Sequence, residues 1–168
     1  GDITGWNTIK VTNMSGMFSY ATYFDQPLNN WDTSRVTDMQ SMFDQAYSFK
    51  HPLKNWDVSN VTDMRAMFWG AYMFNQPLDN WNVSNVTDMI RMFGDAESFN
   101  QPINTHLVTR EDGTTYQAWD TSRVTDMRGM FDNAKGFNQD LSNWNTSRVK
   151  HMSYMFENAK GFNQDLSN

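Results

Sequence analysis

The chain has 168 residues, of which 39% are hydrophobic, and it contains no cysteine. This length suits one domain with a shared core, and the absence of cysteine excludes a disulfide framework or a thiolate metal site. The net charge of -6 argues against nucleic acid or an anionic membrane surface as a partner, because both require a basic patch.

A unit of 25 residues recurs along the whole chain. Each copy starts at a tryptophan, and the copies begin at residues 6, 31, 56, 81, 119 and 144. Only the spacing of 38 between the fourth and fifth copies departs from 25. A fixed period in this range is typical of a solenoid. We therefore expect a single solenoid domain over residues 1–168, with one insertion.

Each repeat predicts a short strand followed by a short helix. In the third copy, Trp56 and Val58 alternate with Asp57, which is the period of a strand. Four apolar residues then follow the i, i+3, i+4, i+7 spacing of a helix over about 62–70, namely Met64, Met67, Phe68 and Ala71. We predict an α/β fold: a leucine-rich-repeat-like solenoid of six coils, each a short parallel strand plus a short helix, curved because helices are wider than strands.

The insertion, about residues 104–118, predicts a β-hairpin. Asp112-Gly113 is a favoured hairpin turn, and it separates Leu107-Val108-Thr109 from Thr114-Thr115-Tyr116. Insertions on a solenoid often carry recognition, so Arg110 and Tyr116 are candidate ligand-binding residues. A tolerated surface hairpin without a ligand is the alternative.

The repeat text resembles a known family. Its pattern is N-W-[DN]-[VT]-S-[NR]-V-T-D-M-x-x-M-F-x-x-A-x-x-F-[ND]-Q-P-L, and it covers the chain apart from the insertion. This pattern is similar to the BspA-like leucine-rich repeats of bacterial surface proteins, including mycoplasma-type and Listeria-type lipoprotein and cell-wall repeats. The resemblance implies an extracellular, often adhesive, cell-surface protein, and it carries over no catalytic residue.

Most of the aromatic and methionine residues form ladders at fixed repeat positions, so we expect them to fill the core rather than bind a cofactor. Five aromatic residues outside these ladders are candidate ligand-binding residues: Tyr20, Tyr23, Tyr47, Trp69 and Tyr72. They could also be ordinary partly covered side chains, or contacts to a neighbouring domain.

The outward positions beside each predicted strand form a second candidate surface. In the third and fourth copies they include Asn55, Asp57, Asn80 and Asn82. Their amide and carboxylate groups could bind glycan hydroxyls or a peptide backbone. They could equally bond to one another along the stack, and the alternation of Asp with Asn favours this structural role because it limits like-charge repulsion.

We therefore expect a non-catalytic binding or adhesion module on the cell surface, which recognises a protein or, as second choice, a glycan. The sequence has no reactive constellation, so we expect no enzyme activity, no cofactor and no metal. A structural spacer in a long surface protein, with no ligand of its own, is the alternative.

The chain opens inside a repeat and stops at a repeat boundary, so we expect it to be a piece of a longer protein whose membrane anchor lies elsewhere. The end coils would then expose ladder residues such as Trp6 and Leu166. Exposed strand edges favour pairing with another chain. We accordingly predict end-to-end self-association, in its simplest form a two-fold dimer through the C-terminal coil.

Overall fold

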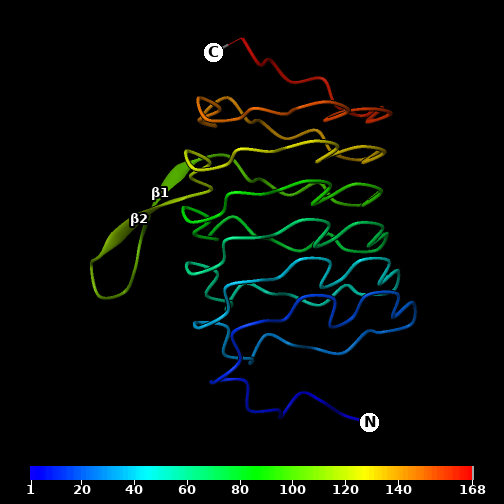
Figure 1. Cartoon of the computed structure of the whole chain (residues 1–168), viewed down its shortest axis with the longest axis vertical. Helices are drawn as coiled ribbons and strands as arrows, with labels where there is room; N and C mark the ends of the chain where they lie inside the picture. Colours follow the sequence, from blue (N-terminus) through cyan, green and yellow to red (C-terminus); the bar gives the residue numbers. More distant parts are fainter. Residues whose placement is uncertain (168) are drawn as a thin grey trace.

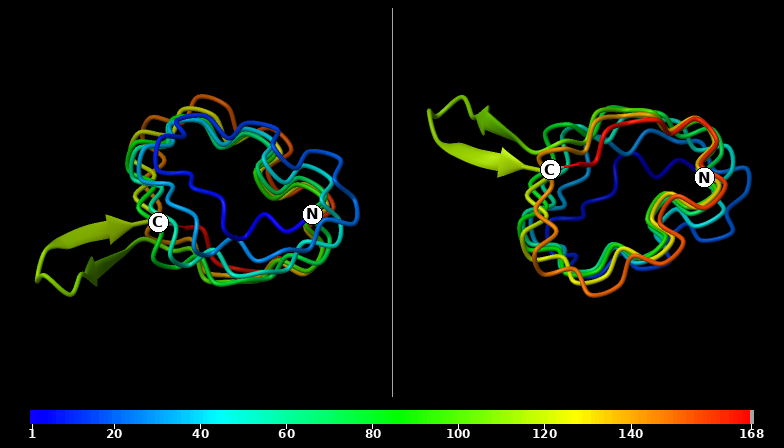
Figure 2. Two further views of the ribbon diagram at one scale, coloured as in Figure 1. Left: turned by 90° about the horizontal axis from the view of Figure 1, so that it is seen from below. Right: turned by 90° about the horizontal axis from the view of Figure 1, so that it is seen from above.

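The computed structural model describes residues 1–167, which form a stack of coils with the two termini at opposite ends (Figure 1). Viewed along the stack, the coils superpose as a flattened ring (Figure 2). Residues at equal repeat positions therefore lie above one another, and the hairpin alone projects from the ring.

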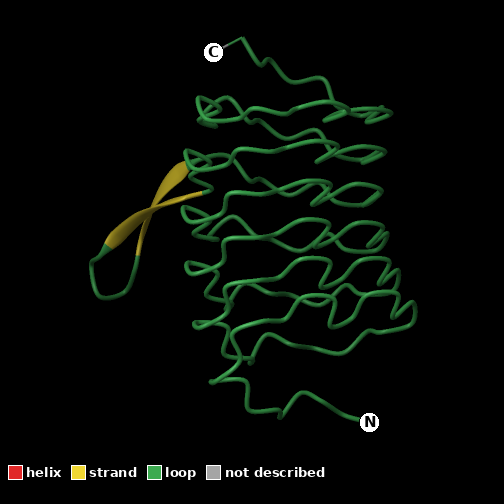
Figure 3. Ribbon diagram, in the orientation of Figure 1, coloured by secondary structure: helices red, strands yellow, loops and turns green. Residues whose placement is uncertain are grey.

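The described residues contain no helix and a single two-stranded sheet (Figure 3). Its strands are β1 (His106–Thr109) and β2 (Thr115–Ala118). Successive coils meet as strands only at isolated parallel bridges, such as Asp38 with Asp63 and Asp63 with Asp88. The prediction of a leucine-rich-repeat-like solenoid, with a strand and a helix in every coil, is wrong.

The predicted helix over 62–70 is a run of turns. From residue 64, every second N–H group donates to a carbonyl of the next coil, at 2.8–3.1 Å. These bonds join Met64 to Asp88, Ala66 to Ile90, Phe68 to Met92 and Gly70 to Gly94. The N–H groups of Met67, Trp69 and Ala71, which lie between them, bond three residues back, to Met64, Ala66 and Phe68. A helix would instead direct each N–H four residues back along its own chain.

This run of turns requires left-handed backbone at two positions in each coil. In the third coil they are Ala66, with φ of 51°, and Gly70, with φ of 66°. Residues at these positions elsewhere include Arg91 and Asp95, at 51° and 53°. Left-handed backbone is uncommon for residues other than glycine. The left-handed conformation occurs at these positions because it directs the backbone N–H group of the residue toward a carbonyl of the next coil.

The spacing between coils explains why no helix forms. Hydrogen-bonded extended chains lie about 4.8 Å apart, whereas a helix is about 10 Å across. A helix in each coil would break the bonds between neighbouring coils. The turns keep the same apolar residues inward, so the sequence spacing was compatible with both structures.

The predicted ladders do fill the core in the interior coils. Phe68 is fully buried and stacks on Phe43 and Phe93 of the neighbouring coils, with ring centroids 5.6 Å apart in both cases. Within its own coil, it stacks on Phe74 at 4.3 Å. The indole Nε1 of Trp56 donates to the carbonyl of Leu28 in the preceding coil at 2.9 Å. The aromatic ladders therefore bind each coil to both of its neighbours.

The hairpin predicted in the insertion is confirmed. β1 and β2 pair antiparallel, with Val108 opposite Tyr116. These two side chains pack against the core cluster, whereas Leu107 is 61% exposed. After β2, Trp119 rejoins the ladder and donates from Nε1 to the carbonyl of Leu78 at 2.8 Å.

Replacing Ala66 by glycine tests the run of turns. We expect Ala66→Gly to stabilise the protein by about 1 kcal/mol, because glycine adopts the left-handed conformation without the penalty of a Cβ atom. In a helix the same change would cost about 1 kcal/mol. Chemical denaturation of the variant gives the sign, and Ala71→Gly, at a buried position outside the left-handed pair, should be destabilising in the same measurement.

Truncating a ladder ring tests the core. We expect Phe68→Ala to lower the free energy of unfolding by about 3–5 kcal/mol, because it leaves a cavity between three coils. Equilibrium unfolding in urea measures the loss. A decrease below about 1 kcal/mol would be typical of a surface position and would contradict the packing described above.

Candidate functional site

A polar cleft lies between the hairpin and the third and fourth coils, with a volume of about 200 Å³. Six of the predicted binding residues line it together: Asn55, Asp57, Asn80, Asn82, Arg110 and Tyr116. The cleft also includes Lys54, Trp56 and Val58, which were not predicted as binding residues. The structure thus joins two candidate sets that the sequence left separate.

Tyr116 attaches the hairpin to the stack. Its hydroxyl group donates a hydrogen bond to the backbone carbonyl of Asn80, 36 residues away in sequence. Burial raises the pKa of Tyr116, so its hydroxyl keeps its proton at neutral pH. The guanidinium carbon of Arg110 lies 4.3 Å from the centre of the Tyr116 ring, in cation–π contact. One wall of the cleft is therefore held in place and carries a cation.

The coils form the opposite wall of the cleft. Some of the polar side chains on this wall already form hydrogen bonds with nearby backbone groups. Oδ1 of Asp57 accepts the N–H of Ser59 at 2.9 Å, and the amide of Asn80 donates to the carbonyl of Lys54 at 2.9 Å. Asn82 closes the same kind of turn as Asp57, onto Ser84. These bonds go to backbone groups, whereas the structural alternative expected the side chains to bond to one another along the stack.

Other groups in the cleft are free to contact a ligand. Arg110 and Lys54 are exposed, and neither forms an ion pair within residues 1–167. Arg110, Lys54 and the amide of Asn55 can donate hydrogen bonds, and the second carboxylate oxygen of Asp57 can accept one. The cleft thus offers cationic donors beside polar acceptors.

Sequence reasoning missed Lys54, although a signal was present. The same repeat position holds Asn29, Asp79, Ser142 and Ser167 in other copies. Lys54 is thus the one cation among them. A comparison of charge at each repeat position would have identified it.

The five aromatic candidates do not form one cluster. Tyr47 and Tyr72 stack with centroids 4.6 Å apart, and burial raises the pKa of Tyr72. Trp69 instead donates from Nε1 to Asp95 at 2.7 Å. Tyr20 and Tyr23 are 65% and 90% exposed, and neither stacks on another ring within residues 1–167. The pair of tyrosines is therefore a small surface feature, separate from the cleft.

Aspartates occupy the bridge position in successive coils and so form a column along the stack. Arg65 pairs with Asp63 at 2.7 Å, and Arg128 pairs with Asp126 at 2.8 Å. Asp88 lies between these two carboxylates. Burial raises the pKa of Asp88, and the charges of Asp63 and Asp126 reinforce the shift. Among the described residues, no group of three or more His, Asp or Glu side chains is arranged to hold a metal ion.

Comparison with family models matches residues 1–106 and 108–168 to the family described as Mycoplasma protein of unknown function, DUF285. The chain belongs to this family. The match is consistent with the mycoplasma-type repeats among the resemblances noted above, but it does not confirm a BspA-like leucine-rich repeat. Searches of curated proteins and of solved structures find no match. In this DUF285 chain, no helix within residues 1–167 is long and apolar enough to cross a membrane.

Neutralising Asp88 tests the aspartate column. Asn13 occupies the same position in the first coil and bonds the N–H of Ser15, so Asp88→Asn can keep the equivalent bond to the N–H of Ile90. A raised pKa means that ionised Asp88 opposes folding. We expect Asp88→Asn to be more stable than the wild type at pH 7.

The gain from Asp88→Asn should depend on pH. It should appear as the pH rises through the raised pKa of Asp88, and vanish below the ordinary carboxyl value, where Asp88 is protonated in both states. Thermal unfolding between pH 3 and pH 8 measures this difference. A gain of equal size at both ends of the range would show that charge is not its cause.

Proposed function

We propose that this chain is a non-catalytic binding module of the bacterial cell surface, and that it recognises a protein ligand through the cleft beside the hairpin. The observation that carries the proposal is the meeting of Arg110, Lys54 and the polar residues of two coils in one cleft. Insertion of the hairpin into an otherwise regular stack supports a role for this place in recognition.

The chemistry of the cleft favours a polypeptide ligand with an acidic side chain. Arg110 and Lys54 can pair with a carboxylate, and the planar guanidinium can do so with two parallel hydrogen bonds. The amide of Asn55 and the free oxygen of Asp57 suit the N–H and carbonyl groups of an extended backbone. A glycan is the second ligand class, because the same amides can bind hydroxyl groups.

An extracellular position on the cell surface is part of the proposal. It is supported by the resemblance of the repeats to those of bacterial surface proteins. The net charge of -6 favours protein or glycan partners over nucleic acid.

The decisive experiment probes protein and glycan arrays with three forms of the chain. The first is the wild type, the second is Arg110→Ala, and the third replaces residues 104–118 by Lys-Asn. The third form restores the 25-residue spacing of Leu53-Lys54-Asn55-Trp56 and so removes the hairpin from a regular stack. We expect the wild type to bind a protein on the array. Both variants should lose at least about tenfold in affinity, as truncation of an anchoring arginine does.

Thr114→Lys, on the exposed turn of the hairpin, is the matched control and should bind as the wild type does. Equal binding by the wild type and the hairpin-free form would contradict recognition at the cleft. Binding to glycans alone would contradict the protein ligand and favour the second class.

A structural spacer remains the second candidate function, and the regularity of the coil contacts favours it. Replacing whole coils by consensus coils separates the two candidates. A spacer would keep the function of the longer surface protein after the replacement, whereas a binding module would lose it.

A further inference from the structure

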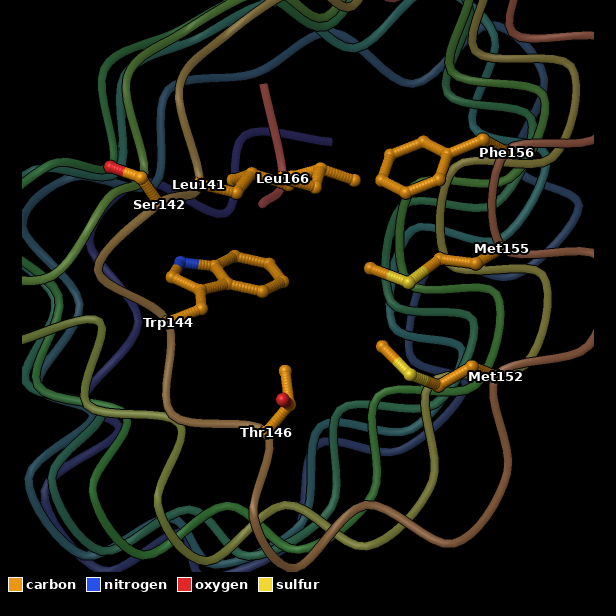
Figure 4. A pocket seen from close by; sticks show the side chains of 8 residues that line it. All are labelled: Leu141, Ser142, Trp144, Thr146, Met152, Met155, Phe156 and Leu166. Carbon is orange, nitrogen blue, oxygen red and sulfur yellow. The ribbon is translucent and has the colours of Figure 1, made fainter. Parts of the chain in front are cut away.

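The hairpin offers backbone groups to a partner in a way that the coils do not. Ladder side chains of the coils point into the ring, as Figure 4 shows for Trp144, Met155 and Phe156. Along the turns, N–H groups such as those of Met64 and Phe68 donate to carbonyls of the next coil. The hairpin is instead an isolated pair of strands that lie side by side and project from the ring (Figure 2). Each strand therefore has an outer edge.

The register of the hairpin determines which backbone groups these edges present. The N–H of Arg110 donates to the carbonyl of Thr114 at 2.8 Å, so this pair is hydrogen-bonded. In an antiparallel ladder, hydrogen-bonded pairs alternate with pairs whose backbone groups point outward. Counted from Arg110 and Thr114, the outward pairs are Thr109–Thr115 and Leu107–Gln117. On β2, the outward N–H and carbonyl groups are thus those of Thr115 and Gln117.

The edge of β2 is open within residues 1–167. No group outside the hairpin bonds to the backbone of Thr115 or Gln117 in this range, and both residues are exposed. Proteins commonly protect such edges with lysine, proline or a bulge. β2 contains only Thr, Tyr, Gln and Ala, and its register with β1 is continuous. The edge of β2 can therefore accept a further strand.

Of the two strands, β2 is the one beside the cleft. Tyr116 of β2 lines the cleft, whereas the lining found within residues 1–167 includes no residue of β1. Side chains alternate between the two faces of a strand, and residues opposite each other on neighbouring strands share a face. A strand added to β2 would therefore direct the side chain opposite Tyr116 toward the cleft.

The charges of the cleft favour an acidic side chain at that position. The guanidinium carbon of Arg110 lies 4.3 Å from the centre of the Tyr116 ring, and Lys54 lines the same cleft. Neither cation forms an ion pair within residues 1–167. The one acidic residue of the lining is Asp57, and its Oδ1 already accepts the N–H of Ser59. A carboxylate beside Tyr116 would thus have two cations available to it.

We propose that the protein ligand binds as an added β-strand: an extended segment pairs antiparallel with the edge of β2 and directs one acidic side chain into the cleft. Its backbone bonds to Thr115 and Gln117, and its acidic residue lies opposite Tyr116. This inference rests on the proposed function, and it adds the conformation of the ligand and the place of its acidic residue. In strand addition, backbone bonds give affinity and alternate side chains give specificity.

Peptides test the proposal on the wild-type protein. The probe is an array of random linear decapeptides, and the tightest binder is then synthesised with one backbone N-methyl group at a time. In antiparallel pairing, the N–H groups of alternate ligand residues point to β2. The acidic residue opposite Tyr116 has its N–H pointing away from β2, whereas its two neighbours bond to Thr115 and Gln117.

The expected pattern therefore alternates along the peptide. N-methylation of either neighbour of the acidic residue should weaken binding at least about tenfold, because an acceptor on β2 is left unpaired. N-methylation of the acidic residue itself should change the affinity less than about threefold. Replacing its carboxylate by the neutral amide should weaken binding at least about tenfold, because the pairing with Arg110 and Lys54 is lost.

Two matched substitutions in the protein distinguish the two edges. Thr115→Pro removes an outward N–H from β2, and Thr109→Pro removes the outward N–H of the residue directly opposite on β1. Proline is tolerated at edge positions of this kind, because the hairpin loses no hydrogen bond of its own. Thr115→Pro should weaken binding of the peptide at least about tenfold. Thr109→Pro should bind as the wild type does.

Gln117→Pro and Leu107→Pro form a second matched pair, in case a first variant does not fold. Loss of binding in Arg110→Ala but not in Thr115→Pro or Gln117→Pro would overturn strand addition and leave recognition at the cleft intact. An N-methyl pattern that does not alternate, or an array without a binding decapeptide, would also overturn it. Equal binding of the peptide by the wild type and the hairpin-free form would contradict the proposed function as well.

Discussion

The hydrogen bond between successive coils is the constraint on which the rest of the structure depends. Because these bonds recur along the turns of each coil, they hold the coils about one extended chain apart. That spacing excludes helices and requires a run of turns in their place. It also requires left-handed backbone at positions such as Ala66 and Arg91, where the N–H group must point to the next coil. The hydrogen bonds between coils thus offset the strain of the left-handed backbone.

The same spacing determines which side chains the repeat tolerates. Identical residues lie above one another, so rings at one position must stack, as Phe43, Phe68 and Phe93 do. At Gly136 the local backbone leaves no room for a side chain, although Ser48 and Met73 hold the same repeat position in other coils. A Cβ atom at Gly136 would lie 2.8 Å from the carbonyl oxygen of Glu97. Repetition thus stabilises apolar positions and penalises charged ones, because like charges also recur one above another.

The hairpin is the place where this regularity is broken. Elsewhere in the stack, a side chain mainly contacts residues at the same repeat position in the neighbouring coils. Few different kinds of side chain therefore lie next to one another. The insertion brings Arg110 and Tyr116 over coils from which they are separated by whole repeats, and the bond from Tyr116 to Asn80 holds them there. A cleft with mixed chemistry can therefore form beside the hairpin, in a stack whose other faces are ladders.

The sequence by itself determined the period, the ladder residues and the hairpin, because each depends on local spacing that is readable along the chain. It did not determine the element between Asp63 and Ala71, since the i, i+3, i+4, i+7 spacing places the same side chains inward in a helix and in the observed turns. Nor did it place Lys54 beside Arg110. Only the tertiary structure decided these two points. The distance between coils excludes a helix between Asp63 and Ala71. The position of the hairpin over the coils places Lys54 and Arg110 in the same cleft.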